Sequence, residues 1–174
     1  NGNALVTEFS GHRVRQITPN GLTTLLAGDT SGGVFGVIGD TEGTGAAARF
    51  AAPFGIAVRR GGQVLVADHI NHRIRQFMPG ATTSTLAGST TGFADGSGPT
   101  AQFNRPAGIA LDDAGRLFVA EYGGHRIRMV LPDGTTSTIA GTGVIGAAGD
   151  GGPASQARLN GPTAVVADGQ GNLF

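Results

Sequence analysis

Histidine, arginine and carboxylate side chains recur together three times along the chain. The string His-Arg-(Val/Ile)-Arg begins at His12, His72 and His125. A carboxylate stands four residues before each histidine, as Glu8, Asp68 and Glu121. Imidazole and carboxylate groups gathered in one place could bind a metal ion or transfer protons. Because the three sets are far apart in the chain, we expect instead a structural role, in which each histidine bonds to a turn and the carboxylate is its partner.

The arginines of the same strings raise a second kind of chemistry. They form three pairs at i and i+2, a spacing that places both members on one face of a strand. The pairs are Arg13 and Arg15, Arg73 and Arg75, and Arg126 and Arg128. Such a surface could bind RNA or another polyanion, but the net charge is zero and Phe77 is the one aromatic residue in these strands. We therefore expect the arginines to pair with carboxylates, and keep polyanion binding as an alternative.

The composition excludes several classes of site. All twelve basic residues are arginine and there is no cysteine, so a Schiff-base lysine, a catalytic thiolate, a disulfide and a zinc finger are all ruled out. The serines show no nucleophile-elbow pattern. Three acidic loops, at 40–43, 95–98 and 150–152, offer one or two carboxylates each, whereas calcium takes about six or more oxygens. We predict no cofactor, with calcium as the alternative.

The segments around the strings repeat as well. Gly62-Gln63-Val64-Leu65-Val66-Ala67-Asp68 is matched near the start of the chain and again from Gly115, and Gly171-Asn172-Leu173-Phe174 begins another copy. We assign residues 1–174 to one repeat domain, with units 2–61, 62–114 and 115–170 and the start of a fourth at 171–174.

Each unit contains four short apolar segments that read as strands. In the second unit they are 64–68, 72–77, 82–87 and 106–111, separated by turns such as Pro79-Gly80. Helical signals are confined to single turns at 45–50, 99–103 and 153–159. The pattern predicts an all-β fold made of β-propeller blades, each of four antiparallel strands. About three blades fit in the chain, which would be half of a six-bladed propeller or a piece of a longer one.

Glycine is the most over-represented residue type, at 32 of 174 residues. A propeller explains it, because tight hairpins need positive φ and the innermost strands crowd together near the axis. We expect the innermost strands at 56–58, 109–111 and 165–167. The remaining histidine, His69, is expected to be exposed in a turn.

The motifs resemble those of the NHL-repeat family, most closely at residues 61–88 with Asn71-His72-Arg73-Ile74-Arg75 at their centre. The motif asparagine is replaced by Gly11 and Gly124, and the motif aspartate by Glu8 and Glu121. The resemblance implies a β-propeller, usually of six blades. It implies no particular activity, since the family's functions vary widely, and similarity to bacterial members makes secretion or a cell-surface location an expectation.

We therefore predict a non-catalytic scaffold that binds a protein, peptide or glycan through the connections 28–52, 88–105 and 141–161. The alternatives are a metal-dependent lyase or hydrolase at the propeller channel, and binding of RNA or another polyanion. The neutral charge argues against a nucleic-acid partner, and no apolar run is long enough for a membrane helix. Three blades cannot close a ring, so a homodimer that completes six blades is a further expectation.

Overall fold

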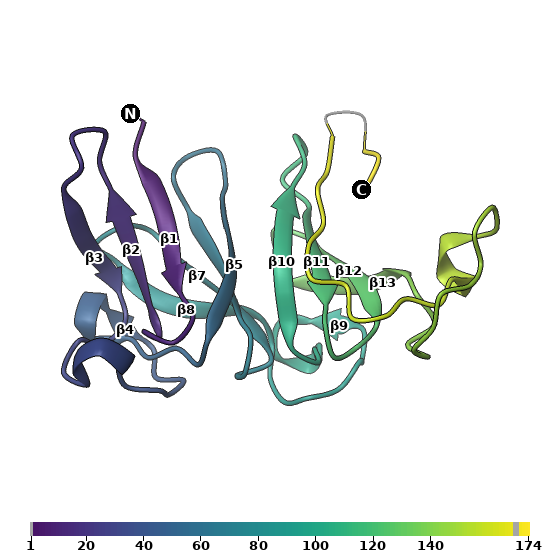
Figure 1. The fold of residues 1–174 in the computed structure, drawn as a ribbon, viewed down its shortest axis with the longest axis horizontal. Helices are drawn as coiled ribbons and strands as arrows, with labels where there is room; N and C mark the ends of the chain where they lie inside the picture. The colour runs from purple at the N-terminus through teal and green to yellow at the C-terminus, as the bar shows by residue number, and fades with distance from the viewer. Residues whose placement is uncertain (1, 169–170) are drawn as a thin grey trace.

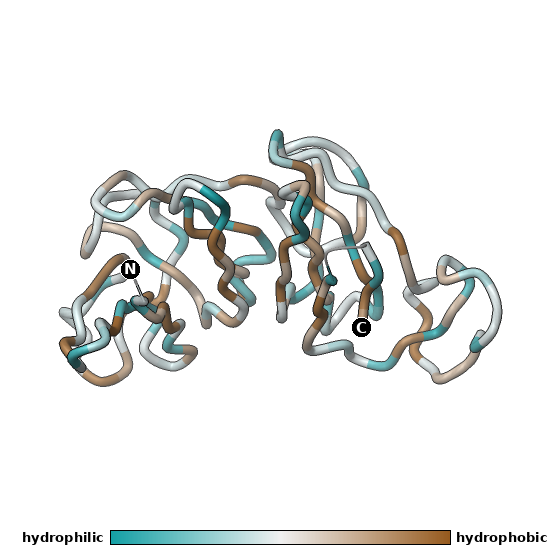
Figure 2. The backbone as a smooth tube through the Cα atoms, turned by 90° about the horizontal axis from the view of Figure 1, so that it is seen from above, coloured by the Kyte–Doolittle hydropathy of each residue, from teal (hydrophilic) through white to brown (hydrophobic). Residues whose placement is uncertain are grey.

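The chain is all-β, as predicted. A computed structural model describes residues 2–168 and 171–174, in which thirteen strands form three antiparallel sheets (Figure 1). The sheets follow one another along a curved row when seen from above (Figure 2). Residues 169–170, where the third predicted unit ends, lie outside the described residues.

The middle sheet shows how one blade is built. Its strands are β5 (Pro53–Val58), β6 (Val64–Asp68), β7 (Arg73–Phe77) and β8 (Thr82–Gly88), and each pairs with the next in sequence. The turn between β7 and β8 contains Gly80 at φ 82°, a conformation that glycine adopts without strain. These are the strands that the repeat pattern predicted.

A short fifth strand extends the middle sheet, and the sequence analysis missed it. β4 (Gly43–Thr44) comes from the connection before the blade and pairs with the outer strand β8. The next sheet repeats the arrangement. It contains β10 (Pro106–Leu111), β11 (Leu117–Glu121), β12 (Arg126–Val130), β13 (Thr135–Ala140) and the short outer β9 (Gly96–Ser97). The connections before these two blades thus run to the outer edge of the blade that follows.

The first sheet has three strands, β1 (Ala4–Glu8), β2 (Arg13–Ile17) and β3 (Thr23–Ala27). They correspond to the second, third and fourth strands of the other blades. Near the C-terminus the predicted innermost strand is only partly formed, since the single bridge Ala167–Leu173 joins it to the start of the next segment. Gly108 N–H donates to Thr163 O at 2.9 Å and ties this segment to β10.

The apolar core lies between neighbouring sheets. Alternate side chains of a strand point to opposite faces, so Leu65 and Ala67 of β6 pack toward the β10–β13 sheet while Val64 and Val66 pack toward the β1–β3 sheet. Both faces are covered, which explains why Val64–Asp68 is buried throughout and why its first four residues form a continuous apolar run.

Four single helical turns lie in the connections: η1 (Gly33–Phe35), η2 (Gly45–Ala47), η3 (Gly98–Thr100) and η4 (Ala154–Gln156). Three fall where the sequence predicted them and η1 was missed. The innermost strands are crowded, as expected. A Cβ atom on Gly55 would lie 2.4 Å from Ala107 O, and one on Gly108 would lie 2.5 Å from Thr163 O. Glycine at these two positions lets the inner strands of successive blades approach closely.

Candidate functional site

The carboxylate and the second arginine of each motif form a buried clamp in the two complete blades. Arg75 Nη1 lies 3.2 Å from Asp68 Oδ2, and both side chains are fully buried. Arg75 also donates to the carbonyls of Arg49 and Thr41, which belong to the connection before the blade. Burial raises the pKa of Asp68, and the hydrogen bonds from Ala51 N–H, Asn71 and Arg75 oppose that rise. The pair therefore fastens the connection to the blade.

The next blade repeats the clamp with glutamate in place of aspartate. Arg128 Nη1 lies 3.2 Å from Glu121 Oε2, with both side chains fully buried. Arg128 Nη2 reaches Asp95 Oδ1 at 2.8 Å and the carbonyl of Ala94 at 3.0 Å. The guanidinium groups of Arg75 and Arg128 also sit over aromatic rings, those of Phe50 and Phe103. The acidic loop at 95–98 thus supplies a partner for an arginine.

Arg75 and Arg128 pair with carboxylates, as expected, and this argues against the alternative of a polyanion surface. Arg75 and Arg128 are enclosed by the connections and cannot contact a polyanion. Arg73 is turned toward Asp40, at 3.5 Å, and Arg126 lies 4.7 Å from the centre of the Phe93 ring. In these two blades the connections cover the second arginine of each pair.

The first sheet holds the same residues in a looser arrangement. Glu8 pairs with Arg13 and, at 3.1 Å, with Arg15, whose side chain is 36% exposed. Partial burial raises the pKa of Glu8, but the hydrogen bonds from Arg13 and Arg15 outweigh this and hold it below its ordinary value.

The motif histidines join one blade to the next, and the expected histidine–carboxylate pairing is wrong. Nδ1 of each ring accepts a hydrogen bond from a backbone N–H just before the following blade's inner strand. The bonds are Ala52 N–His12 at 3.0 Å, Arg105 N–His72 at 3.1 Å and Gly161 N–His125 at 3.0 Å. An accepting Nδ1 must be unprotonated, so each imidazole is neutral with its proton on Nε2. The carboxylates are instead occupied by arginines.

The fourth histidine, which was expected to be exposed in a turn, packs among aromatic rings. His69 is half-buried, and its ring centre lies 5.8 Å from that of Phe54, 6.0 Å from that of Phe9 and 6.2 Å from that of Tyr122. Its Nδ1 is 3.0 Å from Pro106 O, which can only accept, so Nδ1 carries a proton here. We call Phe9, Phe54, His69 and Tyr122 the aromatic arc.

The aromatic arc follows from the repeat. Phe9, His69 and Tyr122 each come directly after the motif carboxylate, so the three blades place one ring each at the same end of their strands. Phe54 joins them from the start of β5. With Ala107 and Thr163, the arc lines a cavity of about 130 Å³ whose walls present only apolar atoms. The signal was visible as an aromatic residue after each acidic one, but no chemistry singled it out.

Further apolar residues are exposed in the connections. Val34, Phe35 and Ile38 lie in the first, Phe93 in the second, and Val144 and Ile145 in the third. Phe93 lines a hollow of about 190 Å³ together with Gly123 and Gly124, which directly follow Tyr122 of the arc. The second connection therefore reaches the residues that follow the aromatic arc in sequence.

Within residues 2–168 and 171–174, no three histidine, aspartate or glutamate side chains come together as a metal site would require. The predicted lack of a cofactor, with its calcium alternative, stays a prediction. The same residues include no helix that is long and apolar enough to span a membrane.

Comparison with known proteins places these features in context. The model of the NHL repeat matches residues 103–128. Protein SUPPRESSOR OF QUENCHING 1, chloroplastic, of Arabidopsis thaliana is 35% identical over 128 residues, which is 71% of this chain and 12% of that protein. The chain thus spans about one eighth of that relative's length.

Two solved structures from Bacteroides thetaiotaomicron are similar in fold. One is a protein of unknown function, with a TM-score of 0.76 and 19% identity over 99% of this chain and 41% of that one. The other is an auxiliary nutrient binding protein, with a TM-score of 0.72 and 19% identity over 98% of this chain and 41% of that one. At this identity the likeness concerns the fold.

Proposed function

Because the chain belongs to the NHL-repeat family of β-propeller proteins, we propose that it is a binding module whose ligand is a protein or peptide. The observation that carries the proposal is the aromatic arc. Four rings with centres about 6 Å apart line one apolar cavity at the end of the inner strands. Exposed rings held on a rigid scaffold are typical of binding hot spots.

The size and walls of the cavity select the kind of ligand. Pockets for whole small molecules run to about 300–1,000 Å³, whereas this one holds about 130 Å³, enough for one side chain. Its walls offer no polar atom, so a sugar hydroxyl would lose its hydrogen bonds to water there. An aromatic or aliphatic side chain of a protein or peptide fits best. The Bacteroides nutrient binding protein shows that a similar fold can serve binding.

A selection experiment tests this proposal. A phage-displayed library of random peptides is panned on the protein, and enriched peptides without Tyr or Trp are titrated while the fluorescence of Tyr122, the only tyrosine, is followed. We expect enriched peptides to share an aromatic or leucine anchor. Affinity should fall at least tenfold in Phe54→Ala and Tyr122→Ala, measured by calorimetry because the second variant lacks the fluorophore.

Phe35→Ala is the matched control, because Phe35 is an exposed ring in η1 and not a member of the arc. It should bind like the unmodified protein. A failure to enrich any peptide contradicts the proposal. Enriched peptides that bind both arc variants with unchanged affinity would also contradict it. A loss of affinity confined to Phe35→Ala would instead favour recognition by the connections, as the sequence suggested.

A further inference from the structure

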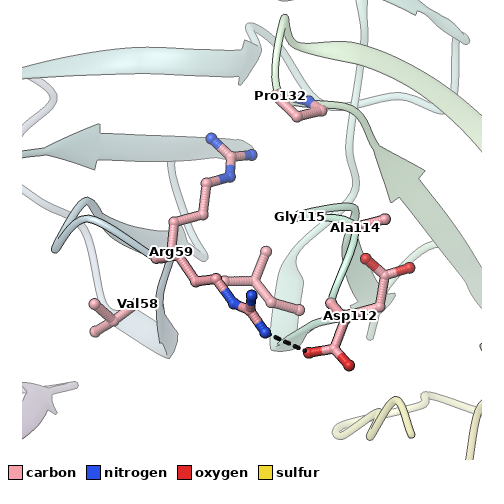
Figure 3. Close-up of a pocket in the computed structure, with 9 residues that line it drawn as sticks. Val58, Arg59, Asp112, Ala114, Gly115 and Pro132 are labelled. Atoms are coloured by element: carbon pink, nitrogen blue, oxygen red, sulfur yellow. Dashed lines mark hydrogen bonds and ion pairs between the residues drawn. The ribbon is translucent and has the colours of Figure 1, made fainter. Parts of the chain in front are cut away.

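A second cavity lies at the other end of the inner strands. It holds about 460 Å³ between the β5–β6 turn and the β10–β11 turn (Figure 3). Phe54 of the aromatic arc stands near the beginning of β5, whereas Val58 of this cavity ends the same strand. The two cavities are therefore separated by the length of a strand, and neither shares a lining residue with the other.

The charges around this cavity do not balance. Arg60 Nη2 pairs with Asp113 Oδ1 at 3.3 Å, the one contact drawn in Figure 3, and Arg116 Nε pairs with Asp112 Oδ2 at 2.5 Å. Both carboxylates among the lining residues are thus taken. Arg59 lines the same cavity, and no ion pair of the described residues includes it. One positive charge is left over.

The guanidinium of Arg59 is held at one side only. Its Nη1 donates to Gln63 Oε1 at 2.7 Å, and Gln63 Nε2 in turn donates to Gln76 Oε1 at 3.1 Å. Nε and Nη2 are both shielded from solvent and have no hydrogen-bond partner. These two atoms form the edge of a guanidinium that binds a carboxylate through two parallel hydrogen bonds. Burial of that unpaired edge lowers the pKa of Arg59.

The repeat shows that the turn does not need this arginine. The equivalent positions in the following hairpins are Asp112 and Asp168, and each accepts a backbone N–H four residues on, from Arg116 and from Asn172. An aspartate is thus the residue that closes this kind of turn. Arg59 puts a cation where the other hairpins have an anion, at the cost of a buried unpaired donor edge.

We propose that this cavity binds a small organic carboxylate, with Arg59 as its anchor. The carboxylate would accept from Nε and Nη2 after the side chain rotates this buried edge into the cavity, a rotation that gives up the hydrogen bond from Nη1 to Gln63. The apolar body of the ligand would pack against Val58, Leu111 and Pro132, which line the same space. A purely inorganic anion would leave those walls without a partner.

Calorimetric titration with benzoate tests the proposal, with inorganic phosphate as the comparison probe. We expect benzoate to bind at millimolar concentration or below, phosphate to bind at least tenfold more weakly, and Arg59→Asp to reduce benzoate affinity at least tenfold. Arg59→Asp should fold, because aspartate occupies the equivalent turns. Arg59→Lys, which keeps the charge but loses the paired donors, should give an intermediate affinity.

Arg158→Ala is the matched control, because it also removes one arginine charge, and Arg158 is exposed and does not line the cavity. It should bind benzoate normally. The proposal is overturned if the unmodified protein binds no benzoate at concentrations up to about 10 mM. It is also overturned if Arg59→Asp binds benzoate with unchanged affinity while keeping its melting temperature, or if phosphate binds as tightly as benzoate. None of these results bears on the aromatic arc, whose residues are untouched.

Discussion

The motif carboxylate and the second motif arginine behave differently in the first and the middle sheet. Arg75 and Asp68 are fully buried and fasten a connection through two backbone carbonyls, whereas Arg15 and Glu8 are 36% and 28% exposed and bond only within their own hairpin. The sequences around them follow the same pattern. The difference is the connection that packs over Arg75. A motif residue is therefore structural to the extent that another segment covers it.

The histidines of the same two sheets show no such difference. His12 and His72 each accept one backbone hydrogen bond, at 3.0 and 3.1 Å, and both have positive φ near 50°. Their partners come from the blade that follows, which is present for both. Each motif thus contains one group that depends on the preceding connection and one that depends on the following blade.

Removing the buried arginine should have the largest effect. We expect Arg75→Ala to lower the free energy of unfolding by about 3–5 kcal/mol, because it leaves Asp68 buried without its counter-ion. Urea denaturation followed by circular dichroism measures the change. The double variant Asp68→Asn/Arg75→Ala should recover only part of the loss, since the carbonyls of Arg49 and Thr41 still lack their donor. Full recovery would show that the clamp matters only as an ion pair.

Replacing either histidine should have a smaller effect, and an equal one in the two sheets. His12→Ala and His72→Ala should each cost about 1 kcal/mol, the value of one hydrogen bond. If the two histidine variants differed in unfolding free energy as much as Arg75→Ala and Arg15→Ala do, the equivalence of the two histidines would be contradicted.

The histidine bond should also depend on pH. Burial lowers the pKa of His12 and His72 from the ordinary value of 6.5. The unfolded chain therefore takes up protons first as the pH falls, so this contribution is complete above about pH 6.5 and is lost below it, toward the folded pKa. The melting temperature should fall between pH 7.5 and pH 5. His72→Asn, which can accept the same bond without titrating, should flatten the profile.

Replacing the partly exposed Arg15 should have the smallest effect on stability. Arg15→Ala is expected to cost about 0.2–1 kcal/mol, because the pair is partly solvated and Glu8 keeps Arg13. The loss should shrink further in 1 M salt, which screens exposed charges. A loss comparable to that of Arg75→Ala would mean that burial does not set the strength of the clamp.

Much of the fold could be predicted because its signals are local. The strand at 64–68 was predicted to the residue, and the turn glycines and helical turns marked most connections. The short outer strand β4 could not be predicted, because two residues, one of them glycine, are too few to show a strand pattern, and they pair only because β8 lies beside them. The histidine partners were missed for the same reason, as Ala52 is 40 residues from His12.

The sequence by itself determined the repeat, its all-β character and the alternation that buries strands such as β6 on both faces, because each depends on residues close together in the chain. Only the tertiary structure decided which arginines are buried, that four rings meet in one arc, and that Arg59 keeps an unpaired edge beside a cavity. Those features depend on which segments pack against one another, and identical motifs acquire different surroundings when the neighbouring segment differs.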